Sequence, residues 1–95
     1  MDRLAKRHAL TANQLGLRAA RRMALQSATL PAEQVDDSYY RESEFLGMAV
    51  RIAADDLALA CDRSRGRFEA TVHKALDAET DRILALIAKG TRSPQ

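Results

Sequence analysis

The stretch FLGMAVRIAADDLALACDRS, residues 45–64, decides the fold of this chain. It contains no proline, and its apolar residues recur at helical spacing, so it predicts one helix. Its apolar residues form two stripes on nearly opposite sides of that helix. One stripe is Leu46, Val50, Ala53 and Leu57, and the other is Phe45, Met48, Ile52 and Leu59. A surface helix has a single apolar stripe, so two stripes predict burial from both flanks, by other helices or by a second copy.

The rest of the chain predicts two more helices around this one. Apolar residues at spacings of three and four run over about 3–28 and 67–89, and the middle helix covers about 38–63. Leu30-Pro31 separates the first two helices, and Gly66 marks the turn before the third. A helix can also continue through a glycine at a cost of about 1 kcal/mol, so one continuous second half is the alternative.

The predicted fold is therefore all-α, with two or three long antiparallel helices in a single domain over residues 1–90. A polar tail at 91–95 is expected to be disordered. The chain has only 95 residues and many of its apolar residues are alanines, so its core must be small. The spare apolar stripe then predicts a helical bundle that is completed by dimerisation, with the middle helix at its centre.

The composition also restricts the expected location of the protein. Cys61 is the single cysteine, so no disulfide can form within the chain. The start, MDRLAKRHAL, lacks the apolar run of a secretory signal, and no stretch has the roughly 18 apolar residues of a membrane span. We expect a cytoplasmic protein without membrane association, although the arginine-rich first third is also typical of an organelle transit peptide. The Ala-, Arg- and Leu-rich composition suggests a bacterial or phage source.

Charge is distributed unevenly along the chain. Residues 1–30 contain six basic residues and one acid, whereas residues 31–60 contain two basic residues and seven acids. The two thirds can neutralise each other within one chain or between two copies. The alternative is that the basic third contacts nucleic acid or an acidic partner.

Two residues, Glu79 and Cys61, could be either functional or structural. Glu79 lies on the apolar stripe of the third predicted helix, where a carboxylate must be paired, for example with Arg18 or Arg22 of the first helix. Cys61 has arginines nearby that could lower its pKa, but no base is placed beside it. We expect a structural ion pair for Glu79 and a packed thiol on the middle helix for Cys61.

The sequence evidence for a metal site is also weak. Glu69, His73 and Asp77 follow one another at spacings of four and so share a helix face. They match no metal-binding motif, and we expect a solvated charged face with no metal and no cofactor. The chain also lacks a glycine-rich phosphate loop, a CxxC pair and a nucleophile elbow, so we predict that it is not an enzyme.

The segment LTANQLGLRAARRM, residues 10–23, partly resembles the helix-turn-helix of DNA-binding repressors. Ala12, Gly16 and Leu25 match its small residue, its turn glycine and a later apolar position, whereas Arg22 stands where the pattern has an apolar residue. The resemblance implies that the basic side chains after the glycine contact DNA: Arg18, Arg21 and Arg22.

These features predict a small non-enzymatic adaptor or regulator that docks a helix face on a protein partner or on itself, as a homodimer. The predicted contact surface consists of Phe45, Met48, Ile52, Leu59, Leu10 and Leu17. The alternative is a nucleic-acid-binding accessory factor that uses the basic first helix. Its predicted contacts are Arg3, Lys6, Arg7, Arg18, Arg21 and Arg22.

Overall fold

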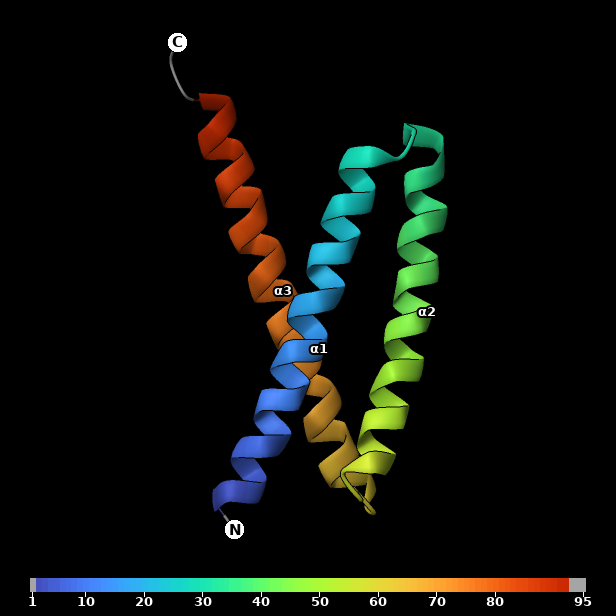
Figure 1. Cartoon of the computed structure of the whole chain (residues 1–95), viewed down its shortest axis with the longest axis vertical. Helices are drawn as coiled ribbons and strands as arrows, with labels where there is room; N and C mark the ends of the chain where they lie inside the picture. Colours follow the sequence, from blue (N-terminus) through green and yellow to red (C-terminus); the bar gives the residue numbers. More distant parts are fainter. Residues whose placement is uncertain (1, 93–95) are drawn as a thin grey trace.

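Three α-helices joined by two short connections make up the described part of the chain (Figure 1). The computed structural model describes residues 2–92, with side chains for residues 6–90. Helix α1 spans Asp2–Thr29, α2 spans Ala32–Asp56 and α3 spans Asp62–Arg92. No strand occurs between residues 2 and 92, and the predicted all-α fold is confirmed. Across the same residues, no helix combines the length and apolarity that crossing a membrane requires.

Helix α1 is the central element of the fold. It packs against both other helices, whereas α2 and α3 contact each other little (Figure 1). Helix α2 returns antiparallel to α1, and α3 crosses behind α1 and leans away from α2 toward its C-terminal end (Figure 1). The prediction that the second helix is central is therefore wrong, because the alanine-rich first helix takes that place.

Gly16 lies where α1 and α3 cross, and it lets their backbones approach closely. A Cβ atom at Gly16 would come within 2.2 Å of the Val72 carbonyl oxygen, 2.7 Å of the Leu76 amide nitrogen and 2.8 Å of Ala75 Cβ. Ala12, one turn earlier on α1, is only 1% exposed. The small residues on this face of α1 thus admit a close neighbour, and that neighbour is α3.

The hydrophobic core joins all three helices and is small. Its buried members are Ala12, Ala19, Leu46, Val50, Ala54, Leu59, Phe68 and Val72. Three of these eight are alanines, so the larger side chains, such as Phe68 and Val72, supply most of the buried apolar area. Burial of each such side chain stabilises the fold by about 1.5–3 kcal/mol. One predicted stripe of the second helix, that of Leu46 and Val50, is buried in this core.

Pro31 separates α1 from α2, as predicted. It is the N-cap residue of α2, with φ −57° and ψ 147°, and its carbonyl oxygen accepts a hydrogen bond from the Gln34 amide at 2.9 Å. Proline suits a helix start because an amide hydrogen there would have no helical acceptor. The predicted start of the second helix at residue 38 is wrong: α2 begins at Ala32, and Ser38 is a buried residue inside it.

The second connection forms around an alanine in the left-handed conformation. Ala58 has a φ of 58°, which glycine normally provides at a helix C-terminus. The Leu59 amide donates to the Ala54 carbonyl oxygen at 2.9 Å, and the Ala58 amide donates to that of Asp55 at 3.0 Å. This is the Schellman hydrogen-bond pattern. The predicted turn at Gly66 is therefore wrong, and Gly66 lies inside α3 with open space beside it.

Replacing Ala58 with glycine should stabilise the protein. The left-handed conformation costs an alanine about 1–2 kcal/mol, whereas glycine adopts it freely but loses more backbone entropy on folding. We expect the free energy of unfolding to rise by about 0.5–1 kcal/mol in urea denaturation. Ala60→Gly is the matched control, because Ala60 has no positive φ. The free energy of unfolding of this control should fall by about 0.4–1 kcal/mol. If it fell in both variants, Ala58 would not be in the left-handed conformation.

The C-terminal part of α3 carries six consecutive apolar residues, Ile83-Leu84-Ala85-Leu86-Ile87-Ala88. Because six successive residues of a helix face all directions, this segment is apolar all round, which is typical of buried helices. Leu84 and Leu86 are nevertheless 58% and 55% exposed. The predicted helix end at residue 89 is too early, since α3 continues to Arg92. Residues 93–95 of the predicted tail lie outside the described residues.

Candidate protein-interaction groove

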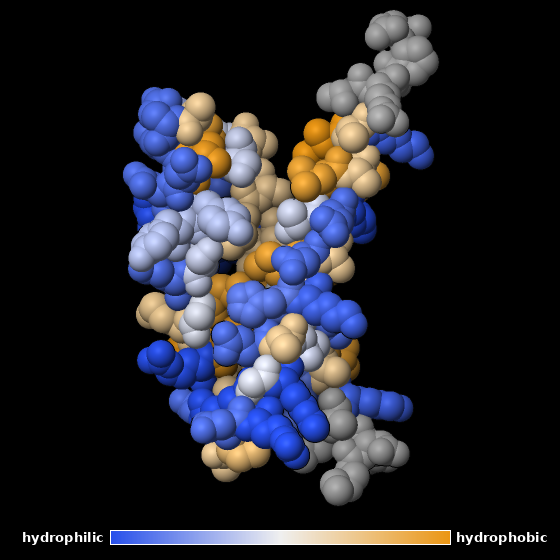
Figure 2. All heavy atoms as spheres, turned by 180° about the vertical axis from the view of Figure 1, so that it is seen from behind, coloured by the Kyte–Doolittle hydropathy of each residue, from blue (hydrophilic) through white to orange (hydrophobic). Residues whose placement is uncertain are grey.

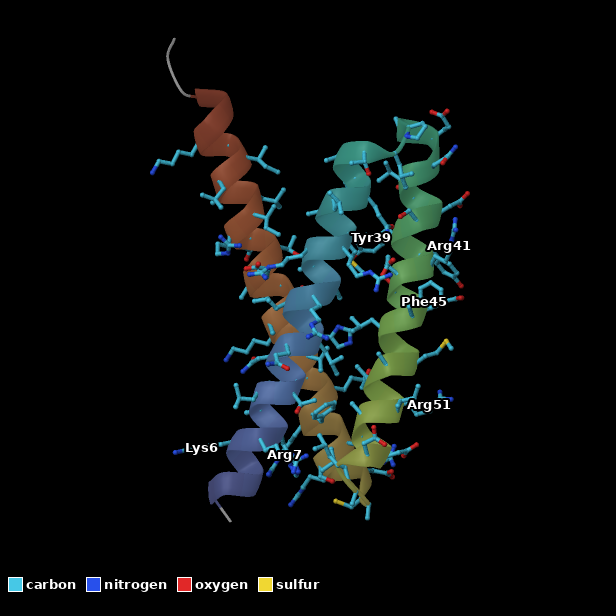
Figure 3. All side chains as sticks on the ribbon, viewed as in Figure 1. Lys6, Arg7, Tyr39, Arg41, Phe45 and Arg51 are labelled. Carbon is cyan, nitrogen blue, oxygen red and sulfur yellow. The ribbon has the colours of Figure 1, made fainter. Side chains whose placement is uncertain are left out.

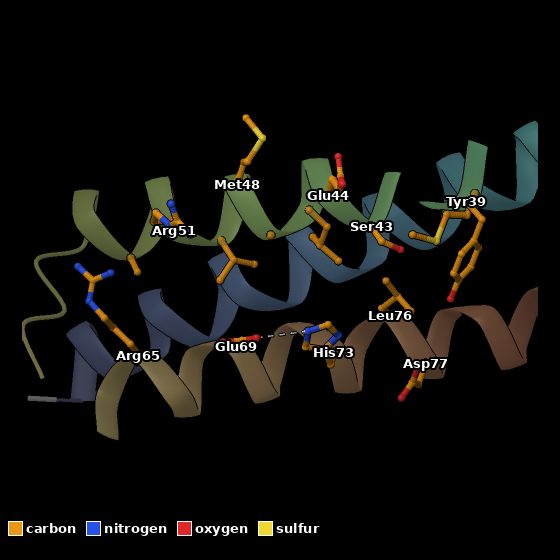
Figure 4. A pocket seen from close by; sticks show the side chains of 15 residues that line it. Tyr39, Ser43, Glu44, Met48, Arg51, Arg65, Glu69, His73, Leu76 and Asp77 are labelled. Carbon is orange, nitrogen blue, oxygen red and sulfur yellow. Dashed lines mark ion pairs between the residues drawn. The ribbon is translucent and has the colours of Figure 1, made fainter. Parts of the chain in front are cut away.

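A groove of about 760 Å³ runs between α2 and α3, with α1 as its floor (Figure 4). It exists because α2 and α3 each pack on α1 and diverge from one another. Its lining includes Met23 from α1, Tyr39, Ser43 and Gly47 from α2, and His73 and Leu76 from α3. Tyr39 reaches across from α2 toward α3, close to Leu76 (Figure 4).

The open end of the groove is apolar. A second hollow, of about 360 Å³, continues from the first, since Met23, Tyr39 and Leu76 line both. Small residues of α1 form one side of it, and Ile83 and Leu84 of α3 form the other. Figure 2 shows the resulting notch from the rear, with hydrophobic residues on its sides and floor.

The closed end of the groove, beside the second connection, is polar. Arg65 of α3 donates from Nε to the Leu59 carbonyl oxygen at 2.7 Å and pairs through Nη2 with the Asp55 carboxylate of α2. Farther along α3, His73 Nε2 lies 3.8 Å from Glu69 Oε1 (Figure 4). Both of those side chains are exposed, so solvent screens their attraction. The groove thus has a charged end beside the second connection and an apolar end beside the C-terminal part of α3.

Glu79 is a buried carboxylate that two arginines hold where α1 and α3 meet. Its Oε2 accepts hydrogen bonds from Arg21 Nε at 2.8 Å and Arg82 Nη2 at 2.9 Å, and its Oε1 accepts one from Arg82 Nε at 2.6 Å. The hydrogen bonds from Arg82, and then those from Arg21, lower the pKa of Glu79 to about 2. The predicted pairing with an arginine of the first helix occurs, but the partner is Arg21 rather than Arg18 or Arg22.

A second buried carboxylate, Glu42, joins α2 to α1. Its Oε1 accepts hydrogen bonds from Gln26 Nε2 at 2.8 Å and Arg22 Nη2 at 3.3 Å. Ser38 in turn donates to the Gln26 side-chain oxygen. The sequence analysis missed Glu42, although its position one turn before Leu46, on the buried stripe, is a usable signal. Both carboxylates hold helices together.

The residues weighed above as metal ligands and the Cys61 thiol can now be located in the structure. Among the described residues, no three His, Cys, Asp or Glu side chains lie close enough to hold a metal ion. Cys61 is exposed in the second connection, so the prediction that it packs on the middle helix is wrong. The Ser64 amide donates to Cys61 Sγ at 3.4 Å, which caps the start of α3. Hydrogen bonds with Ser64 lower the pKa of the Cys61 thiol.

The predicted contact surface lies mostly outside the groove. Phe45, Met48 and Ile52 are each at least half exposed, and of these three only Met48 is among the residues that line the groove (Figure 4). Leu59 is buried in the core, which removes it from that surface. The two remaining members lie on α1 and are an exposed and a half-buried leucine: Leu10 and Leu17.

The predicted nucleic-acid contacts on α1 divide into two groups. Arg21 and Arg22 bind the buried carboxylates described above. The other three described members are Lys6, Arg7 and Arg18, and all five of these side chains are exposed. The side chain of Arg3 lies outside the described residues. Helix α1 passes through Gly16 without a turn, so the helix-turn-helix interpretation is wrong.

The groove residues are those that sequence reasoning missed, because periodicity identifies apolar faces but not the divergence of two helices. The nearest signal is the all-apolar run at 83–88, whose continuous pattern suggests burial that the single chain does not supply. Comparisons of the chain with protein-family models, with curated proteins and with solved structures find no match.

Proposed function

We propose that this protein is a non-enzymatic helical interaction protein that binds an amphipathic helix in the groove between α2 and α3. The observation that supports this proposal is the apolar open end of the groove, where Met23 and Tyr39 face Ile83 and Leu84 across a hollow. In helix-in-groove recognition, the apolar face of a helix packs into an apolar groove of this kind.

The helix that we propose for the groove is the C-terminal part of α3 from a second copy. Its residues 83–88 are apolar all round, so one face can pack on its own chain while another faces a partner. In a two-fold dimer, the C-terminal part of each α3 would lie in the groove of the other copy. The apolar residues of α3 and the apolar end of the groove would then be buried against each other. Each buried leucine-sized side chain would contribute about 1.5–3 kcal/mol to the association.

Leu84→Glu should convert the dimer into a monomer. A carboxylate in the apolar hollow would be desolvated in the dimer but solvated in the monomer, so we expect the dissociation constant to rise at least about tenfold. Sedimentation equilibrium over a dilution series measures this, and circular dichroism checks that the helices persist.

Ile52→Glu is the matched control for this experiment. Ile52 is as exposed as Leu84 but lies on the outer face of α2, so this variant should remain dimeric. A monomeric wild-type chain would contradict the proposal. Dissociation by Ile52→Glu in place of Leu84→Glu would instead assign the interface to the outer face of α2.

A further inference from the structure

A basic stripe runs along α3, on a face separate from the groove. Residues at spacings of three and four on this face are basic, small or hydroxylic: Arg67, Thr71, Lys74, Ala78, Arg82, Ala85 and Lys89. Its basic residues are exposed and span about 33 Å at 1.5 Å per residue. The five acids of α3 are not members of the stripe: Asp62 is in the first turn, Glu69 and Asp77 line the groove, Glu79 is buried and Asp81 flanks the stripe.

Helix α1 adds positive charge along the same edge of the molecule. Residues 3–30 contain no acid, and Lys6 projects from the left edge in Figure 3, where nitrogen-tipped side chains of α3 also project. Arg21 of α1 meets Arg82 of α3 at Glu79, so two guanidinium groups share one carboxylate and the cluster stays positive.

The acidic residues gather on the opposite edge. Helix α2 carries seven acids and two basic residues and forms the right edge in Figures 1 and 3. The molecule measures 52 × 28 × 16 Å, whereas the screening length at physiological salt is about 8 Å. A ligand on the part of α3 that leans away from α2 is therefore largely screened from the acids of α2, although the whole chain carries a net charge of only +2.

We propose that this edge binds the phosphate backbone of nucleic acid without regard to sequence. The residues that form the site are Lys6, Arg21, Arg67, Lys74, Arg82 and Lys89. The basic stripe of α3 is as long as about one turn of a DNA duplex, which is roughly 34–36 Å. Between its basic residues stand Thr71 and alanines, which are too short to reach base edges in a groove, so the contacts would be to phosphates.

The composition of the stripe favours nucleic acid over a membrane surface. A helix that lies on an anionic bilayer inserts large apolar side chains beside its basic residues. On this face of α3 the positions that are not basic hold a threonine and two alanines: Thr71, Ala78 and Ala85. Because these side chains are short, the longer basic side chains project beyond them and can reach the phosphates of a duplex.

Fluorescence anisotropy with a labelled random-sequence duplex tests the proposal across a salt series. Glu79 neutralises one of the six basic residues, so about five phosphates are contacted. The wild type should bind at low salt with a slope of log K against log salt of about −4.5, because each neutralised phosphate contributes about −0.9. Lys74→Glu combined with Lys89→Glu should weaken binding at least about tenfold and flatten the slope by about 2. Neither lysine belongs to the Glu79 cluster, so the fold should remain intact, as circular dichroism can check.

The matched control is Arg41→Glu combined with Arg51→Glu on α2. Both double variants change the net charge of the chain from +2 to −2. The α2 control should keep its duplex affinity within about twofold, because the acidic edge makes no phosphate contacts. Three results would overturn the proposal: no wild-type binding at low salt, equal loss in both double variants, or binding to anionic vesicles without binding to the duplex.

Discussion

Gly16→Ala should destabilise the protein by about 2 kcal/mol. The added methyl group would lie 2.2 Å from the Val72 carbonyl oxygen and 2.7 Å from the Leu76 amide nitrogen. Both are backbone atoms, which cannot turn aside as a flexible side chain can, so α1 and α3 must separate. Overpacking costs about 1–3 kcal/mol, and we expect the upper end where only backbone atoms can give way; the better helix propensity of alanine offsets about 1 kcal/mol of this. Urea denaturation followed by circular dichroism measures the net loss.

Gly47→Ala makes the same chemical change in the middle of α2 and is the control. Nothing lies within 4 Å of a Cβ atom at Gly47, so only the helix propensity changes. Its free energy of unfolding should rise by up to about 1 kcal/mol. A similar gain at Gly16 would mean that α1 and α3 do not cross there.

Glu79→Gln should lower the melting temperature at pH 7, and the deficit should vanish as the pH falls. The pKa of Glu79 is about 2 in the folded protein, against an ordinary value of 4.5. The unfolded chain therefore takes up the proton first as the solution is acidified. The stabilisation by the carboxylate is fully present above about pH 4.5 and is lost as the pH falls toward 2.

Thermal melts of both proteins between pH 2 and 7 measure this effect. Glu69→Gln is the control, because Glu69 is exposed and its ion pair with His73 is between two exposed side chains. It should reproduce the wild-type melting curve at each pH within the small effects of surface charge. If the curves of the wild type and Glu79→Gln stayed parallel down to pH 2, the two arginines would not be holding the carboxylate.

The number and type of helices could be predicted from sequence, but the second connection could not. Pro31 restricts its own backbone and that of Leu30, so the first break is visible in the residues themselves. The second break lies at Ala58, a residue with no preference for the left-handed conformation that it adopts. Burial of Leu59 in the core favours the turn there, and such tertiary contacts have no signature in local sequence. Gly66, which has that local signature, remains helical.

The groove could not be predicted because it depends on which helix pairs approach closely. The small face of α1 was visible in the sequence, but its partner was not. Once Gly16 brings α3 against α1, the C-terminal part of α3 leans away from α2 and leaves the hollow beside Tyr39 and Leu84. Periodicity finds the apolar faces, and the crossing decides which of them meet.

The pair Arg21-Arg22 defines how α1 is rotated about its own axis. Neighbouring residues leave a helix about 100° apart, and these two side chains bind carboxylates on different helices, Glu79 on α3 and Glu42 on α2. An alanine-rich surface is nearly the same at several angular settings, so alanine packing alone would leave this rotation poorly determined. Turning α1 by one residue would separate both arginines from their carboxylates and move Gly16 out of the crossing. Two adjacent arginines thus fix the rotation of the alanine-rich helix α1 about its axis.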